Sequence, residues 1–182
     1  LELLTEEERK KLYPILGSEQ ISEIFAYLED VEQYVKELNL ESAAKVISNM
    51  DSDDAVDVLG EMDDSTQEKL VRLMDDESSR DVRLILSYEE DEIGSRMTTN
   101  FILVKNNLSV RQTMRELVEQ AGENDNISTI YVEDEEGHFY GAIDLKDLIR
   151  ARDYVALDSL ISTSYPYVHD KEKISACIER IK

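Results

Sequence analysis

The chain has 182 residues, with 42 acidic and 20 basic side chains and a formal net charge of −22 at pH 7. This surplus of negative charge repels phosphate backbones and anionic lipid surfaces, which excludes nucleic acid as a partner, and it attracts cations. A single cysteine, Cys177, excludes an internal disulfide. The sequence has no apolar run of membrane-spanning length, begins without Met and stops within a helical pattern, so we expect a soluble fragment of a longer chain.

Residues 1–87 are expected to be entirely helical, because they contain few strand formers. From Leu40 onward a short motif recurs every twelve residues. Its columns are Met50, Met62, Met74 and Leu86; Val46, Val58, Leu70 and Val82; and Ile47, Leu59 and Val71. Acidic or Ser residues that suit helix caps follow each Met. The repeat therefore predicts short helices that stack as a superhelical array.

An acidic connector at residues 88–96 separates this array from a region of mixed pattern at residues 97–155. Alternating and helical periodicities in that region predict five elements. In chain order they are a strand at Ile102–Val104, a helix at Val110–Gln120, strands at Ile127–Glu133 and Phe139–Ile143, and a helix at Leu145–Ala151. An acidic turn ending in Gly137 joins the last two strands as a hairpin, and Asp144 is placed to cap the final helix.

The start of this region recurs 64 residues later. Met97–Phe101 matches Ile161–Tyr165, and the apolar positions of the first helix match those of a second one. The matched positions are Val110, Met114 and Leu117 with Ile174, Ile178 and Ile181. Residues 156–182 are thus expected to begin a second copy that stops before its own hairpin. Cys177 matches Thr113 on a packed helix, so we expect it to be buried.

Two copies of this pattern, with the Gly141–Asp147 ending Gly-Ala-Ile-Asp-Leu-Lys-Asp, resemble a tandem CBS-domain pair. With the helical array and the acidic connector before Met97 and Thr98, the chain resembles the cytosolic part of the MgtE family of magnesium transporters. The resemblance implies an α plus α/β fold, in which a superhelical array of short helices precedes a tandem CBS module with an incomplete second copy. It also implies a CBS-mediated homodimer at the cytoplasmic face of the cell membrane. In that family Mg²⁺ binds between the helical and CBS parts and favours the closed state of a C-terminal transmembrane pore domain of the same chain.

Three acidic residues are candidate metal ligands. Asp53 and Asp57 are four residues apart, which places them on one helix face, and Mg²⁺ often needs only one or two carboxylates. The resemblance places metal ligands at these two positions and at Glu23. The alternative interpretation is that Asp53 caps its helix and Asp57 is a solvated surface acid.

Adenine-nucleotide binding is the alternative function, because many CBS pairs bind such nucleotides. The resemblance places a ribose-binding acid at Asp147, a base-stacking position at Thr129 and a basic position at Lys146. Asp144 stands where that pattern has a hydroxyl residue, and its carboxylate would repel a phosphate. The simpler interpretation, which we favour, is that Asp147 is a first-turn helix acid.

Catalysis has little support in the sequence. His138 and His169 lack triad-like or zinc-like spacing, and no Gly-rich phosphate loop is present. We therefore expect a non-enzymatic Mg²⁺-sensing region, with a nucleotide sensor or a plain interaction scaffold as alternatives. The homodimer interface is expected to come from the apolar positions of the two matched helices, which are Val110, Met114, Leu117, Ile174, Ile178 and Ile181.

Overall fold

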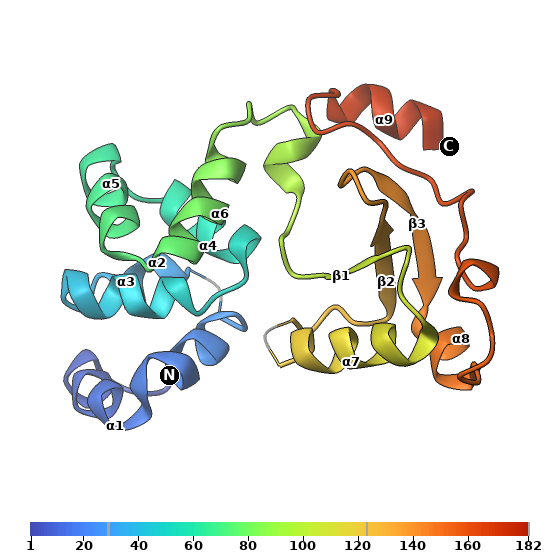
Figure 1. Ribbon diagram of the computed structural model, residues 1–182. Coiled ribbons are helices and arrows are strands. Elements are labelled where there is room, and N and C mark those ends of the chain that lie inside the picture. The colour runs from blue at the N-terminus through green and yellow to red at the C-terminus, as the bar shows by residue number, and fades with distance from the viewer. Residues whose placement is uncertain (29, 123, 182) are drawn as a thin grey trace. The chain divides into compact units, whose positions relative to one another are not determined.

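The computed structural model describes residues 1–28, 30–122 and 124–181, without the side chains of residues 180 and 181. It consists of two compact units, Leu1–Thr99 with His169–Lys182, and Asn100–Val168 (Figure 1). No helix among the described residues is long and apolar enough to cross a membrane. The expected second copy contributes to both units, and the domain boundaries inferred from the sequence stay a prediction.

The first unit is built from helices. They are α1 (Glu6–Phe25), α2 (Val31–Val35), α3 (Leu40–Ser48), α4 (Ser52–Gly60), α5 (Asp64–Leu73) and α6 (Asp76–Leu86), followed by a 3₁₀ turn, η1 (Ile93–Arg96), and, from the other end of the chain, α9 (Ile174–Ile181). The described part of residues 1–87 contains no strand, which confirms the helical prediction.

The twelve-residue repeat sets the boundaries of four of these helices. Their N-cap residues, twelve apart, are Asn39, Asp51, Asp63 and Asp75. Two of the apolar columns, the one that begins at Val46 and the one that begins at Ile47, are buried in the described structure. Their exposed fractions run from 0% at Ile47 and Leu59 to 7% at Val58. Each helix packs against the next but one, α3 against α5 and α4 against α6. Short helices that are marginal alone therefore share one continuous core.

A further column of the repeat joins successive helices by hydrogen bonds. The Gln67 side chain donates to the Leu59 carbonyl at 3.3 Å, and the Ser79 hydroxyl donates to the Val71 carbonyl at 3.0 Å. Both carbonyls lie in the last turns of their helices, where intrahelical partners are missing. The equivalent position in the two earlier helices is a buried alanine, Ala43 in α3 and Ala55 in α4.

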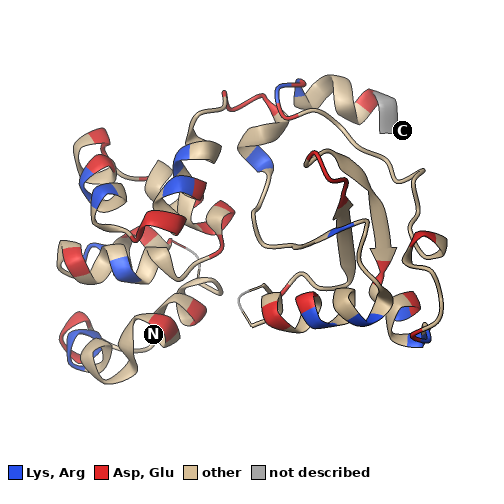
Figure 2. Ribbon diagram, viewed as in Figure 1, with Lys and Arg blue, Asp and Glu red and all other residues tan. Residues whose placement is uncertain are grey.

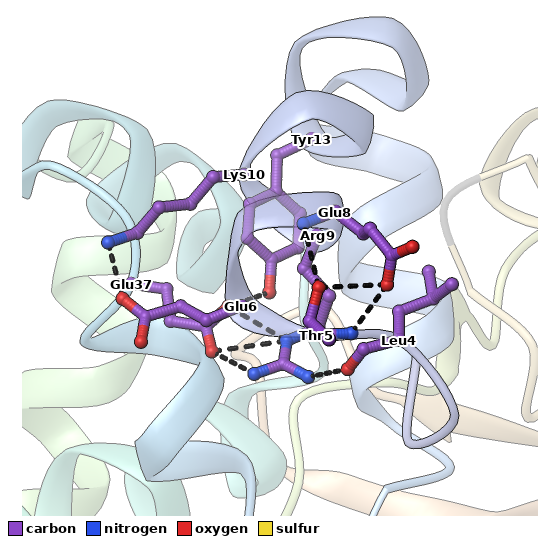
Figure 3. A network of polar contacts seen from close by, with 8 residues as sticks. All are labelled: Leu4, Thr5, Glu6, Glu8, Arg9, Lys10, Tyr13 and Glu37. Carbon is purple, nitrogen blue, oxygen red and sulfur yellow. Dashed lines mark hydrogen bonds and ion pairs between the residues drawn. The ribbon is translucent and has the colours of Figure 1, made fainter.

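A buried polar network holds α1 to the end of α2 (Figure 3). The Glu37 carboxylate accepts hydrogen bonds from Arg9 Nε at 3.0 Å and from the Tyr13 hydroxyl at 2.7 Å, and Arg9 also donates to the Leu4 carbonyl. The Arg9 guanidinium keeps the pKa of Glu37 below its usual value, although burial opposes this shift. Further along α1, Gly17 interrupts the helix with φ 80° and ψ 168°, a conformation open essentially to glycine alone.

The acidic connector pairs with the loop that precedes α9. Lys173 Nζ lies 2.8 Å from a Glu89 oxygen and 2.7 Å from an Asp91 oxygen, and the Tyr88 hydroxyl donates to Asp170 at 2.7 Å. Backbone amides of the connector also donate to carbonyls of this loop. Cys177, on α9, is 2% exposed, which confirms its expected burial.

The second unit is a three-stranded sheet with two helices. Its elements are β1 (Ile102–Lys105), α7 (Val110–Gln120), β2 (Thr129–Glu133), β3 (Phe139–Asp144), α8 (Leu145–Arg150) and a 3₁₀ turn, η2 (Leu157–Ser159) (Figure 1). The strand order is β1-β2-β3, with β1 parallel and β3 antiparallel to β2. The predicted hairpin and the helix after it are confirmed, and the first strand of the hairpin begins two residues later than expected.

The apolar stripe of α7 faces the core of its own unit. Val110 and Leu117 are 4% and 6% exposed and pack with Ile102, Ile130 and Ile143 of the sheet. Val110 and Leu117 are therefore not surplus to the sheet, which contradicts the expectation of a dimer interface for these two residues; Met114 is only partly buried, and the homodimer stays a prediction. Ile178 is half exposed, and the side chain of Ile181 lies outside the described residues.

Candidate functional site

Acidic residues recur along the helices of the first unit (Figure 2), and α4 carries a concentrated group of them. The N-cap residue of α4 is Asp51, and Asp53 lies in the first turn together with Asp54. The interpretation of Asp53 as the cap is thus wrong, since the helix begins at the preceding Ser52. The buried Ser52 hydroxyl lies 3.0 Å from both the backbone nitrogen and the hydroxyl oxygen of Thr99, which fixes the start of the helix.

One face of α4 borders a cavity of about 190 Å³. Four carboxylate residues line it: Asp30, Asp54, Asp57 and Glu61. Its apolar part comes from the end of α1 and the start of α2, including Phe25 and Val31. We call this the acidic cavity. Asp53, one of the two predicted ligands on α4, is exposed and is not among its lining residues.

Negative charge is crowded around Asp54, one of the carboxylates of the acidic cavity. Partial burial raises the pKa of Asp54, and the carboxylates of Asp53, Asp51 and Asp57 raise it further. Among the described residues, no Lys or Arg forms an ion pair with Asp54, Asp57 or Glu61. A cation bound near these carboxylates would relieve their mutual repulsion.

Asp30 enters the acidic cavity from a left-handed backbone conformation, which is uncommon outside glycine although Asp adopts it more often than most residues. It is the N-cap residue of α2, with φ 53° and ψ 46°, and its side chain makes no capping hydrogen bond. No other non-glycine residue in the described part of the chain has a positive φ. Left-handed backbone outside glycine is sparsely populated and is found more often at functional positions.

The chemistry of the acidic cavity suits a hydrated divalent cation. Within the described residues, no three acidic, His or Cys side chains are close enough together to enclose a metal ion directly. Mg²⁺ nevertheless retains several waters and is commonly held by one or two carboxylates, so dispersed carboxylates fit this ion better than they fit a fully dehydrated one. The residues present therefore fit a Mg²⁺ ion held partly through its waters.

The sequence-predicted ligands are only partly brought together. Asp57 lines the acidic cavity, and Asp53 lies one turn away on α4. Glu23 is exposed on α1 and does not line the cavity. Asp54 and Glu61 were not predicted as ligands, although their spacing of three and four residues from Asp57 places all three on one helix face.

The candidate nucleotide-binding residues gather at one end of the β2–β3 hairpin. Thr129, half-buried, is paired with Asp144 in the strand ladder. Asp144 caps α8 by accepting from the Lys146 amide at 2.8 Å, as expected from the sequence. Lys146 and Asp147 are exposed in the first turn of α8. The fold thus places these residues together on one short segment, while their binding role stays a prediction.

Comparisons with known proteins match both regions of the chain. The family model of the MgtE intracellular N domain matches residues 1–91, and that of the CBS domain matches residues 90–154. A magnesium transporter MgtE of Enterococcus faecalis (strain ATCC 700802 / V583) is 41% identical over 182 residues, covering 96% of this chain and 40% of that protein. This chain therefore spans less than half of that transporter.

Two solved structures resemble nearly the whole chain. The crystal structure of the soluble part of a magnesium transporter has a TM-score of 0.90 at 29% identity, covering 99% of this chain and 72% of the other. That of the cytosolic domain of the Mg²⁺ channel MgtE in complex with ATP has a TM-score of 0.85 at 25% identity, covering 99% and 75%. These proteins are parts of a magnesium transporter and a Mg²⁺ channel, not enzymes, in agreement with the expectation from the sequence. With the helical array and the CBS fold both matched, the chain belongs to the MgtE family of magnesium transporters.

Proposed function

We propose that this chain is the cytosolic Mg²⁺-sensing region of a magnesium transporter. The observation that carries the proposal is the acidic cavity, whose carboxylates have no basic partner among the described residues. Asp57 and Asp54 are the residues that would hold the hydrated ion, with Asp53 one turn away. A bound Mg²⁺ supplies positive charge at a place where the fold concentrates negative charge.

In this proposal Mg²⁺ bridges the acidic helical array and the CBS part and favours the closed state of the membrane pore. An ion shifts a conformational equilibrium only by the difference in its affinity for the two states. The empty acidic surfaces repel each other, so the bridged arrangement gains more from the ion than the open one does. The regulated pore would be the C-terminal transmembrane domain of the full-length protein at the cell membrane, and the regulatory part would act as a homodimer.

The test is a Mg²⁺ titration followed by thermal unfolding and by small-angle scattering. Mg²⁺ at a hundred times its dissociation constant stabilises the bound form by about 2.7 kcal/mol per site, so the melting temperature should rise and the radius of gyration should fall. NaCl of equal ionic strength should do much less, because it screens all charges alike. Equal compaction by NaCl would contradict the proposal.

Two double variants that change the net charge equally distinguish binding at the α4 carboxylates from a general effect of negative charge. Asp53→Asn with Asp57→Asn should remove most of the Mg²⁺-specific stabilisation. Glu77→Gln with Asp81→Asn changes the net charge equally, at the same spacing on α6, and should leave the Mg²⁺ response intact. If both double variants lose the response to the same extent, the α4 carboxylates are only part of a solvated acidic face.

A second candidate function is adenine-nucleotide sensing, which the likeness to the ATP-bound MgtE domain favours. Asp147 would accept hydrogen bonds from the ribose hydroxyls, next to Thr129 and Lys146. Since Asp144 would repel a phosphate, Asp144→Ser should strengthen ATP binding in calorimetry while keeping a helix cap. Asp147→Asn should weaken binding of ATP and of adenosine alike, whereas Asp153→Asn should weaken neither. Equal affinity in all four proteins would exclude this site.

A further inference from the structure

A second and larger cavity lies between α1 and α3 on the helical unit. Its volume is about 430 Å³, within the range of small-molecule sites. It involves none of the residues discussed so far as metal or nucleotide ligands. We call it the α1–α3 cavity.

One wall of the α1–α3 cavity is held rigid by the buried network of Figure 3. Tyr13 and Glu37 line the cavity, and their hydrogen bond, together with the Arg9–Glu37 ion pair, ties α1 to the segment before α3. The Glu37 side chain is 9% exposed, and its oxygens already accept from both Arg9 and Tyr13. Its charge is therefore used within the fold, and these contacts fix one wall of the cavity.

The charged groups left at this cavity are cationic. Lys10 and Lys45 both line it. Lys10 is shared with Glu6 at 2.5 Å, but Lys45 has no hydrogen-bond or ion-pair partner in the part of the chain that the structure describes. Because Glu37 is paired with Arg9 and Lys10 with Glu6, Lys45 contributes an uncompensated positive charge at the cavity, in a chain with more than twice as many acids as bases. A positive charge at a cavity attracts an anion.

The rest of the lining combines apolar residues with small or polar ones. Pro14 and Ile21 come from α1, whereas Leu38 and Val46 come from the α3 side. An inorganic anion would leave these apolar surfaces uncovered. A ligand with both an anionic group and an apolar body would cover them and pair with Lys45.

We propose that the α1–α3 cavity binds a small amphipathic anion, whose charged group pairs with Lys45 and whose apolar body packs against Pro14, Ile21, Leu38 and Val46. This assigns the helical array a small-molecule site that is separate from its acidic cavity. A short-chain aliphatic carboxylate or an aromatic carboxylate has both of these features and is the class of ligand that we expect.

The test uses the 182-residue chain and hexanoate as probe, with backbone amide chemical shifts recorded by NMR. Hexanoate should cause saturable shifts in residues 14–21 and 38–46. Acetate has the charge without the body, and hexanol has the body without the charge, so both should bind at least about tenfold more weakly. If hexanol binds as well as hexanoate, or acetate does, the proposal is wrong. The absence of saturable shifts from both hexanoate and benzoate overturns it as well.

Variants then locate the site. Lys45→Gln should weaken hexanoate binding about tenfold. Lys11→Gln makes the same charge change on α1, at a residue that does not line the cavity, and should leave binding unchanged. Ser42→Leu fills the cavity from α3 and should abolish binding without lowering the melting temperature by more than about 2 °C. If Lys11→Gln weakens binding as much as Lys45→Gln, the lysines act only through net charge and the proposed site is excluded.

Discussion

Asp54 is the α4 carboxylate whose ionisation the fold opposes. Its pKa is raised chiefly because it loses water, and next because Asp53, Asp51 and Asp57 surround it. A carboxylate with a raised folded-state pKa binds protons more readily in the folded protein than in the unfolded one. Ionisation of Asp54 therefore lowers the stability of the folded protein as the pH rises above 3.8, the ordinary pKa of an Asp carboxyl. Protonation of Asp54 restores that stability as the pH falls.

This sign leads to a testable expectation for Asp54→Asn. The variant should melt higher than the parent at pH 7, by on the order of a degree or two because the group is partly solvated. The gain should shrink as the pH is lowered toward 4, because Asp54 of the parent takes up a proton more readily than a free Asp does, and it should shrink in millimolar Mg²⁺. Thermal unfolding across this pH range measures it. A gain of the same size at pH 4 and pH 7 would show that charge is not the cause.

The residues around the acidic cavity show which parts of a site can be predicted from the sequence and which cannot. Asp57 was found because a spacing of four residues is visible within one helix. Asp30 was not found, because it reaches the same cavity from a different helix and from a left-handed backbone that sequence spacing does not reveal. Glu23, placed by resemblance, does not line that cavity.

At the scale of elements, local signals predicted the fold well. The caps and apolar columns of the repeat gave the helix boundaries, and alternation with a glycine turn gave the hairpin. The pairing of the connector with the segment before α9 was not predicted, because Lys173 and Glu89 are 84 residues apart. The burial of Val110 and Leu117 of α7 in the core of their own unit was also not predicted, since periodicity identifies an apolar face but not the surface that covers it.

Two glycines provide a matched test of packing. A Cβ on Gly141 in β3 would lie 2.6 Å from the Ser162 carbonyl oxygen and 2.7 Å from Ile161 Cγ2, so Gly141→Ala should destabilise its unit by about 1–3 kcal/mol. A Cβ on Gly60 in α4 would meet nothing within 4 Å, so Gly60→Ala should stabilise by about 0.5–1 kcal/mol. Urea denaturation followed by circular dichroism measures both, and effects of the same sign would contradict the described contacts.

The connector is a second element with a defined test. Lys173→Gln removes the ion pairs with Glu89 and Asp91, which are exposed and therefore contribute little to global stability. The local effect should be larger, with amide hydrogen exchange at Ile93, Gly94 and Ile174 several-fold faster than in the parent. Lys171→Gln, with the same charge change, serves as the control. Unchanged exchange in Lys173→Gln would mean that the backbone pairing alone fixes the connector.

At the scale of the whole molecule, the proposed homodimer requires an interface other than the buried stripe of α7. Val118 on α7 and Ile149 on α8 are 67% and 63% exposed, and these two helices pack against each other. We expect Val118→Glu with Ile149→Glu to yield a monomer in light scattering at high protein concentration in Mg²⁺. Ile15→Glu, at an equally exposed apolar residue of α1, should leave the dimer intact. A monomeric parent protein under these conditions would exclude the proposal.

The twelve-residue spacing of the helix caps has a consequence for how such a chain can change over generations. A gene duplication or deletion of thirty-six nucleotides adds or removes one complete helix with its cap, its apolar columns and its place in the stack. A shorter insertion inside one of the helices α3–α6 rotates the later apolar residues of that helix off its buried face and destabilises the stack. Lineages of this fold should therefore differ in array length by whole units, with other length changes confined to the turns.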